Sequence, residues 1–277
     1  MQTLITVEQL RAMLGDRSLV VFDCRFSLQD TAAGAKAYRE AHVPGALFAD
    51  VATDLSSPHI PGSTGRHPLP ARQHWLRRLQ AWGLRPAQQV VAYDDAGGAG
   101  AARLWWMLRW AGHEQVAVLD GGWQAWLAAQ QPVTAALPAT PERASFDYAT
   151  LPPLTTLVEA AQVDAAHQVL LDARESPRFR GEVEPLDPVA GHIPGAQCSP
   201  YSGNLGPDGR FKPAAALREK FAVAAGSDQP LVCYCGSGIT ACHNILALRV
   251  AGLPEAALYA GSWSEWVTDP ARPVARG

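Results

Sequence analysis

The residues best suited to chemistry in this chain lie in one short stretch, CYCGSGITACHN, at residues 233–244. It places three cysteines and a histidine around two glycines. Side chains of these types can hold a metal ion, form a disulfide or supply a thiolate nucleophile. The spacing of the residues favours one of these three chemistries over the others.

The spacing argues against a metal site and against a disulfide. The pattern is C-x-C-x6-C-H, whereas structural zinc sites use close cysteine pairs, usually with a second pair far along the chain. A disulfide between Cys233 and Cys235 would be strained, and the stretch lacks the C-x-x-C redox motif. Cys242 and His243 fall in the first turns of a predicted helix. We interpret them as a small buried thiol and a capping or surface histidine.

A single nucleophile, Cys235, fits the loop better. Gly236 and Gly238 let the backbone curl so that successive N–H groups surround the sulfur. A helix predicted to begin near Thr240 adds its positive end, and both effects favour thiolate over thiol. Tyrosine-type phosphatases share this layout but need an arginine after five intervening residues. That position is Ala241 here, which excludes a phosphatase.

Composition sets the class of protein. The 277 residues are 48% hydrophobic and 18% charged, which is enough for one or two ordinary cores, and the formal charge of −3 makes nucleic acid a poor partner. The start, MQTLITVEQL, lacks the features of a secretory signal, and no apolar run reaches the length of a membrane helix. Five cysteines, an odd and sparse set, suit reduced thiols. We therefore expect a soluble, cytoplasmic protein that binds no membrane.

The sequence contains an internal repeat. Its two copies lie about 140 to 150 residues apart, a spacing that indicates a duplicated domain. The Pro- and Ala-rich stretch 133–153 reads as a linker. We predict an N-terminal domain at 1–132 and a C-terminal domain at 154–277. When the two copies are aligned, Asp94 occupies the position of Cys235, so we expect only the second copy to be catalytic. The matching pairs are VVFDCRF (20–26) with VLLDARE (169–175), AHVPGAL (41–47) with GHIPGAQ (191–197), VVAYDDAGG (90–98) with LVCYCGSGI (231–239), and LDGGWQAW (119–126) with YAGSWSEW (259–266).

Each copy predicts the same α/β architecture. Short apolar runs at 19–23, 89–93, 169–172 and 230–234 alternate with helical patterns, which indicates a parallel sheet flanked by helices. In such sheets, sites form where the carboxyl ends of strands meet helix N-termini. Cys235 lies at such a junction. His42 and His192 occur once in each copy, in the H-[VI]-P-G turns, so we interpret both as structural.

With the duplicated DxR and H-[VI]-P-G-A patterns, the C-G-S-G-I-T loop and the paired Gly-x-Trp segments, the whole chain resembles the two-domain rhodanese-type sulfurtransferases. The loop is most similar to that of the 3-mercaptopyruvate sulfurtransferases. Thiosulfate enzymes usually carry basic residues directly after the cysteine. The resemblance implies two rhodanese-like domains with the active site in the cleft between them.

The resemblance also assigns substrate-binding residues. Arg178 matches the family arginine that holds the donor's carboxylate, and a two-pronged guanidinium suits that group. The loop amides of Gly236, Gly238, Ile239 and Thr240 are expected to cradle the transferred sulfur. A second family arginine often follows an E-P dipeptide, but Leu186 and Asp187 stand there, which leaves the donor open, with Arg180 as a substitute.

Three further residues are implied as a proton relay. Ser237 resembles the serine that acts near the sulfur, and His67, in GRHPLP, matches the histidine that supports it from the first domain. The acid behind this histidine is less clearly marked. Ala52 occupies the nearest position, and Asp54 is the expected acid in preference to Asp50.

The expected reaction is sulfur transfer from 3-mercaptopyruvate to a thiol or cyanide acceptor through a Cys235 persulfide, with no metal or organic cofactor. One alternative is thiosulfate:cyanide transfer by the same cysteine. Another is a persulfide carrier that delivers sulfur to a protein partner. A thioredoxin-like reductant is a further candidate partner.

Overall fold

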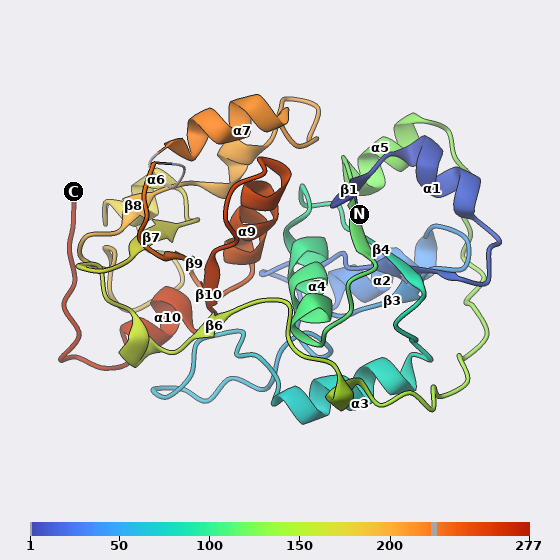
Figure 1. Cartoon of the computed structure of the whole chain (residues 1–277), viewed down its shortest axis with the longest axis horizontal. Helices are drawn as coiled ribbons and strands as arrows, with labels where there is room; N and C mark the ends of the chain where they lie inside the picture. Colours follow the sequence, from blue (N-terminus) through green and yellow to red (C-terminus); the bar gives the residue numbers. More distant parts are fainter. Residues whose placement is uncertain (1, 223–225) are drawn as a thin grey trace. The chain divides into compact units, whose positions relative to one another are not determined.

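The computed structural model describes residues 2–222 and 226–277, which fold as two compact units (Figure 1). Unit 1 runs to Ser57 and takes in Leu69–Leu154 and Asp208–Arg210. Unit 2 takes in Pro58–Pro68, Thr155–Pro207 and Phe211–Gly277. The segment Pro58–Pro68, which carries Arg66 and His67, therefore belongs to unit 2 although it lies in the first half of the sequence.

Unit 1 is built on a five-stranded parallel sheet in the order β1-β5-β4-β2-β3. Its central strands are continuous apolar runs because both faces of a parallel sheet are covered. Their side chains form the core together with the buried Trp126. The elements are β1 Leu4–Ile5, α1 Val7–Met13, β2 Leu19–Asp23, α2 Ala33–Glu40, β3 Leu47–Phe48, α3 Arg72–Ala81, β4 Gln89–Tyr93, α4 Ala99–Trp110, β5 Val116–Leu119, α5 Gly122–Ala128 and the 3-10 turn η1 Tyr148–Thr150.

Unit 2 repeats this plan with a parallel sheet in the order β6-β10-β9-β7-β8. Strand β9 lies at its centre, so the loop that follows β9 sits at the middle of the sheet's carboxyl edge. The elements are β6 Leu157–Val158, η2 Ala160–Gln162, β7 Val169–Asp172, α6 Ser176–Phe179, β8 Gln197–Cys198, η3 Tyr201–Asn204, α7 Ala214–Lys220, β9 Leu231–Tyr234, α9 Thr240–Val250, β10 Ala257–Tyr259 and α10 Ser262–Trp266.

The register of the two sheets confirms the duplication. Asp23 pairs with Tyr93 in unit 1, and Asp172 pairs with Tyr234 in unit 2. Three of the predicted strands have the predicted bounds, and the fourth begins one residue late, at Leu231. The α/β fold with two parallel sheets flanked by helices is therefore confirmed.

A buried arginine–aspartate pair ties each H-[VI]-P-G turn to its sheet. In unit 2, Arg174 bonds to Asp172 at 2.6 Å and also donates to the carbonyl of Gly191 at 2.7 Å. Arg25, Asp23 and the carbonyl of Ala41 repeat these contacts in unit 1. The two pairs are structural because they are the same in both units.

The turn histidines are structural as well. His192 stacks on Phe179 with ring centroids 3.7 Å apart, and its Nδ1 lies 2.8 Å from the carbonyl oxygen of that residue. His42 makes the same two contacts with Tyr38. Both rings are buried, as the duplication predicts.

The stretch 133–153 packs on unit 1. The N–H of Ala144 bonds to the carbonyl of Gln80 at 2.9 Å, and Tyr148 is fully buried with its hydroxyl 2.9 Å from Nδ1 of His113. The segment predicted to be a linker therefore contributes to the core of the first unit before the chain enters the second.

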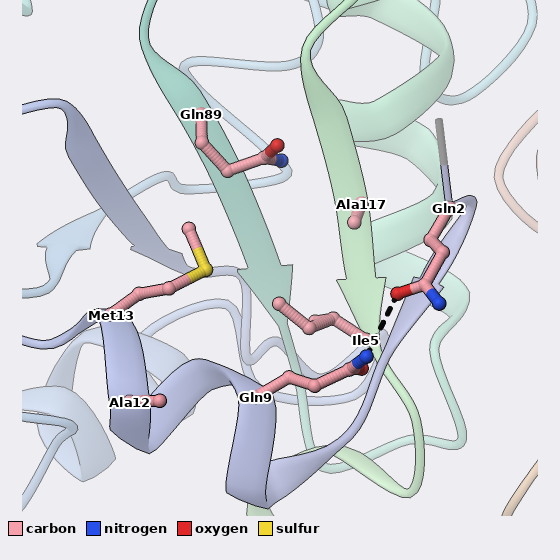
Figure 2. A pocket seen from close by; sticks show the side chains of 7 residues that line it. All are labelled: Gln2, Ile5, Gln9, Ala12, Met13, Gln89 and Ala117. Carbon is pink, nitrogen blue, oxygen red and sulfur yellow. Dashed lines mark hydrogen bonds between the residues drawn. The ribbon is translucent and has the colours of Figure 1, made fainter.

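A pocket of about 370 Å³ opens beside β1 and α1 of unit 1 (Figure 2). Among the described residues that line it, none carries a thiol or a titratable group, and amides and apolar side chains make up its wall. It therefore offers no group for catalysis. The lining residues are Gln2, Ile5, Gln9, Ala12, Met13, Gln89 and Ala117.

In the described part of the chain, no helix has both the length and the apolar character needed to cross a bilayer.

Candidate active site

Cys235 is the first residue after β9 and begins the loop that leads into α9. The residue is buried, at 2% exposed. The N–H of Gly238 points at the sulfur, with nitrogen and Sγ 3.1 Å apart, and the Ser262 hydroxyl lies 4.0 Å from Sγ. The same hydroxyl accepts the N–H of Cys235 at 3.0 Å. Because the Ser262 hydroxyl donates its proton to the carbonyl of Tyr259 at 2.9 Å, the Gly238 N–H is the donor that faces the sulfur.

The loop is locked to the start of α10. The carbonyls of Cys235 and Gly236 accept the N–H groups of Trp263 and Ser264, both at 3.0 Å. Gly238 has a φ of +82°, and a Cβ there would lie 2.3 Å from the carbonyl oxygen of Ala260. Glycine is therefore required at this position, both for its backbone conformation and for the close approach.

The equivalent loop of unit 1 holds a carboxylate. Asp94 follows β4 as Cys235 follows β9, and its oxygens accept the N–H groups of Ala96, Gly98 and Ala101, each at 2.8 Å. Burial raises the pKa of Asp94, while these three hydrogen bonds lower it. The scaffold thus forms an anion-binding loop at this edge of the sheet, with a fixed carboxylate in unit 1 and a cysteine in unit 2.

Ser237 and His67 are brought together. The Ser237 hydroxyl, two residues from the cysteine, lies 2.8 Å from Nδ1 of His67. Ser237 is buried, and His67 is half-buried rather than exposed on a loop. A hydroxyl bonded to an imidazole in this way can pass a proton to or from a group beside the cysteine.

Asp54, the predicted acid behind His67, lies in unit 1. Its carboxylate accepts the N–H of Asp50 at 3.0 Å and pairs with Arg78 at 3.2 Å. Burial raises the pKa of Asp54, and these two contacts oppose the rise. Its role in the relay stays a prediction.

Arg178, at the end of the short helix α6, is held by carboxylates. Its Nη2 donates to Glu184 at 2.6 Å and to Asp187 at 3.3 Å, and its Nε donates to Glu184 at 3.2 Å. Its Nη1 lies 3.4 Å from the point where a Cβ on Gly236 would be. Arg178 is therefore a fixed cation beside the loop. Arg180 instead pairs with Glu182 at the surface.

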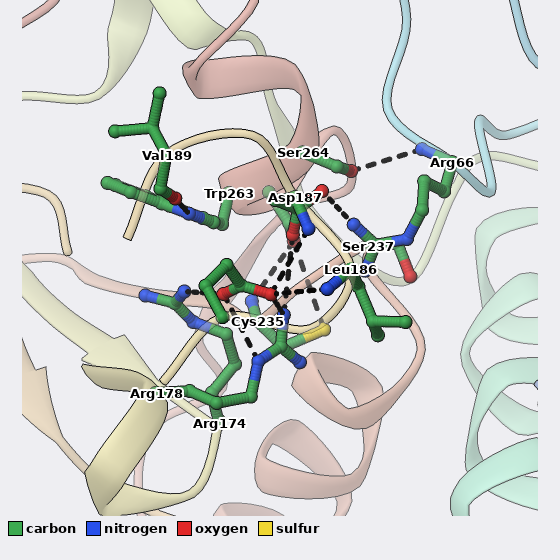
Figure 3. Close-up of polar contacts among 12 residues, drawn as sticks. Arg66, Arg174, Arg178, Leu186, Asp187, Val189, Cys235, Ser237, Trp263 and Ser264 are labelled. Atoms are coloured by element: carbon green, nitrogen blue, oxygen red, sulfur yellow. Dashed lines mark hydrogen bonds and ion pairs between the residues drawn. The ribbon is translucent and has the colours of Figure 1, made fainter. Parts of the chain in front are cut away.

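Sequence reasoning missed Arg66. Its backbone N–H donates to the Ser264 hydroxyl at 3.0 Å, and its guanidinium bonds to Asp187 (Figure 3). A Cβ on Gly236 would lie 2.9 Å from Arg66 Nη2. In the sequence, Arg66 is marked only by its position directly before His67. An arginine next to a histidine is too common to indicate a functional residue.

The last predicted loop residues lie where α9 begins. Ile239 is buried at the N-cap position, and Thr240 is the first residue of the helix. Cys242 is a buried thiol, as predicted, and its sulfur lies 3.3 Å from the carbonyl oxygen of Gly238.

The interpretation of His243 as a capping or surface residue was wrong. Its side chain is fully buried, stacks on Phe211 with centroids 4.6 Å apart, and bonds through Nδ1 with Asn204. The reason is that α9 is covered on all sides, so a polar residue early in this helix has no solvent-facing position.

Among residues 2–222 and 226–277, no three His, Cys, Asp or Glu side chains are grouped so that they could hold a metal ion.

The chain therefore contains two copies of one α/β domain, each built on a parallel sheet. The second copy carries a candidate cysteine nucleophile in its anion-binding loop. The sequence model of the rhodanese-like domain matches residues 6–129 and again 155–269. The chain belongs to the rhodanese-like family.

Relatives of known description support the assignment. A Pseudomonas aeruginosa protein named "Probable 3-mercaptopyruvate sulfurtransferase" is 53% identical over 284 residues, covering 99% of this chain and 98% of that protein. The rat thiosulfate sulfurtransferase is 35% identical over 269 residues, covering 94% of this chain and 88% of its own length. The solved structure of the 3-mercaptopyruvate sulfurtransferase from Leishmania major has a TM-score of 0.85 at 32% identity, covering 96% of this chain and 74% of that one.

Proposed function

We propose that this protein is a sulfurtransferase that moves sulfur from 3-mercaptopyruvate, through a persulfide on Cys235, to a thiol or to cyanide. The observation that carries the choice of donor is the 2.8 Å contact between Ser237 Oγ and His67 Nδ1, two residues from the cysteine. A donor whose leaving group must be protonated needs such a relay. The full-length likeness to the Pseudomonas aeruginosa relative supports the same choice.

In the first half-reaction, the Cys235 thiolate attacks the sulfur of 3-mercaptopyruvate and the donor's carbon–sulfur bond breaks. The electron pair of that bond leaves on the carbon as the enolate of pyruvate. The Ser237 hydroxyl, resupplied by His67, delivers the proton that turns the enolate into pyruvate. Cys235 keeps one added sulfur as a persulfide, which the Gly238 N–H faces.

In the second half-reaction, an acceptor takes the outer sulfur. A thiolate acceptor becomes a persulfide and cyanide becomes thiocyanate, and in either case the electron pair of the sulfur–sulfur bond returns to Cys235. The scheme is ping-pong covalent catalysis and uses no metal or organic cofactor. A thioredoxin-like reductant in the cytoplasm is the protein acceptor that we propose.

Thiosulfate is the second candidate donor. Two arginines, Arg66 and Arg178, lie against Gly236, although the residues after the cysteine are themselves uncharged. Guanidinium groups beside the loop can donate hydrogen bonds to the oxygens of thiosulfate as well as to a carboxylate. A persulfide carrier, which would load sulfur without turning over small acceptors, is the alternative of another class.

A side-by-side measurement of kcat/KM tests the proposal. With dithiothreitol as acceptor, we expect 3-mercaptopyruvate to exceed thiosulfate in kcat/KM by about tenfold or more. The relay supplies the proton that the pyruvate leaving group needs, whereas no basic residue directly follows Cys235 to attract the thiosulfate dianion. The reverse order would make this a thiosulfate enzyme. Stoichiometric persulfide without turnover of either donor would make it a carrier.

A further inference from the structure

Two guanidinium groups meet beside the residue that follows the candidate nucleophile. Arg178 comes from α6, and Arg66 comes from the segment Pro58–Pro68 of the same unit. A Cβ built on Gly236 would lie 2.9 Å from Nη2 of Arg66 and 3.4 Å from Nη1 of Arg178. One small point in space is therefore within reach of both cations. Any side chain at Gly236 would fill that point.

Asp187 joins the two arginines. Its Oδ1 accepts from Nη1 of Arg66, and its Oδ2 accepts from Nη2 of Arg178 at 3.3 Å (Figure 3). The carboxylate is 3% exposed, and burial raises its pKa while the hydrogen bond from Arg66 lowers it. Glu184 fixes the other end of this arrangement, because it bonds to Arg178 and accepts the N–H of Asp187 at 3.2 Å.

These bonds leave one arm of each guanidinium available. Within the described residues, Nη2 of Arg66 and Nη1 of Arg178 have no hydrogen-bond acceptor, and both are turned toward Gly236. The side chains are 22% and 18% exposed, so solvent reaches them. Two fixed donors of this kind match the two oxygens of a carboxylate.

The charges of the cluster cancel. Each arginine in it is paired with carboxylates, and the members are Arg66, Arg174, Arg178, Asp172, Glu184 and Asp187. Because three side chains are positive and three are negative, the cluster has no net charge, yet its guanidinium groups still offer hydrogen-bond donors. Such a site serves a monoanion that makes two hydrogen bonds better than it serves a compact dianion.

We propose that Arg66 is a second arginine of the carboxylate-binding subsite expected at Arg178, and that Asp187 is the positioning residue that joins the two arginines and sets the donor preference by neutralising their charge. This rests on the proposed function and deepens it. Arg66 is thereby a specificity-determining residue. Asp187 touches no substrate and acts through the two arginines.

The test compares Arg66→Gln with Arg180→Gln, the matched control on an arginine that pairs with Glu182 away from Gly236. With 3-mercaptopyruvate and dithiothreitol, we expect Arg66→Gln to raise KM about ten- to a hundredfold, the range of one charged hydrogen bond, with kcat changed about twofold or less. A KM equal to that of Arg180→Gln would overturn the subsite. A lower kcat at unchanged KM would overturn it too, because Arg66 would then act through His67.

A second measurement needs no turnover. Pyruvate carries the carboxylate of the proposed donor, so it should protect Cys235 from alkylation by iodoacetamide, and Arg66→Gln and Arg178→Gln should each raise the half-protecting concentration about tenfold. Wild-type protein that is protected but does not use 3-mercaptopyruvate would refute the proposed function and keep the subsite. If the wild type uses 3-mercaptopyruvate but pyruvate protects Arg66→Gln and Arg180→Gln equally, the proposed function is kept and the subsite is refuted. If Arg66→Gln fails to fold, Arg66→Lys keeps the charge and should show an intermediate KM.

The role of Asp187 is read from the ratio of donors. Asp187→Asn leaves one excess positive charge, which should shift the ratio of kcat/KM values toward thiosulfate by about fivefold, the Coulomb benefit of one extra charge on the donor. If Asp187→Asn only disturbed the positions of the arginines, kcat/KM would fall for both donors together. An unchanged ratio would refute the charge role.

Discussion

At the scale of single residues, what distinguishes Cys235 from the other cysteines is its surroundings. Burial raises the pKa of the Cys24 and Cys233 thiols, which keeps both protonated. Cys198 is exposed at the end of β8 with the Ser176 hydroxyl 3.4 Å from its sulfur. Cys235 instead faces the Gly238 N–H from a loop in which the peptide bonds are fixed. The sulfur at this position has a hydrogen-bond donor before any substrate arrives.

The first prediction concerns Ser237. Ser237→Ala should slow turnover of 3-mercaptopyruvate about tenfold or more, because the pyruvate enolate loses its proton donor. Thiosulfate turnover should hardly change, since sulfite leaves as a stable anion, and it serves as the internal control. His67→Ala should follow the same pattern more weakly. Equal slowing with both donors would reduce the hydroxyl to a role in loop shape.

Several candidate site residues could be named from the sequence because they are adjacent to the candidate nucleophile or belong to a motif. Ser237 lies two residues from Cys235, and Arg178 sits in a recognisable R-F-R-G stretch. Arg66 could not be predicted, because its approach to Gly236 depends on how the segment Pro58–Pro68 packs in unit 2. Such long-range contacts leave no local pattern. The burial of His243 could not be predicted for the same reason.

At the scale of elements, the central strands were readable and the edge strands were not. Strands β2, β4, β7 and β9 are covered on both faces, so each is a continuous apolar run. Edge strands such as β1 and β8 have two residues each, too few to show any periodicity. The loop after β9 was predicted from its glycines, since glycine adopts the φ of +82° at Gly238 without the strain that a side chain adds there.

The second prediction concerns this loop. Gly238→Ala should destabilise the fold by more than the roughly 1–2 kcal/mol of a left-handed alanine, because its Cβ would meet the Ala260 carbonyl at 2.3 Å. The matched control is Gly45→Ala, with φ +80° and nothing within 4 Å of the added Cβ. Denaturant unfolding gives both costs.

The same substitution should move the sulfur. The rate of persulfide formation in Gly238→Ala should fall by up to about a hundredfold, the effect of a displacement of about 1 Å in a reacting group. Gly45→Ala should leave the rate at its wild-type value. If Gly238→Ala matched Gly45→Ala in both stability and rate, the loop would not be the rigid support described above.

At the scale of the whole molecule, duplication has separated two uses of one loop. Unit 1 closes its loop around the Asp94 carboxylate, and unit 2 places Cys235 at the same register position. The fixed carboxylate occupies the amides that would otherwise receive an anion from outside. Unit 1 therefore has a loop that is complete by itself and has no place for a donor.

The third prediction tests this division of roles. Asp94→Ala should destabilise the protein by several kcal/mol, because three amide donors lose their acceptor and each unpaired buried donor costs about 1–3 kcal/mol. Asp95→Ala, at the exposed neighbouring position, should cost much less. The midpoints of urea unfolding measure the difference. Equal midpoints would mean that the unit 1 loop does not depend on its carboxylate.

The central claim is that sulfur is carried by Cys235, and mass spectrometry after treatment with 3-mercaptopyruvate without acceptor tests it most directly. We predict one added sulfur atom, located on the peptide that contains Cys235. Cys198→Ser and Cys242→Ser should acquire it as the wild type does, and Cys235→Ser should fold normally, as judged by circular dichroism, and acquire none. Sulfur found on Cys198, Cys233 or Cys242, or still acquired by Cys235→Ser, would contradict the account.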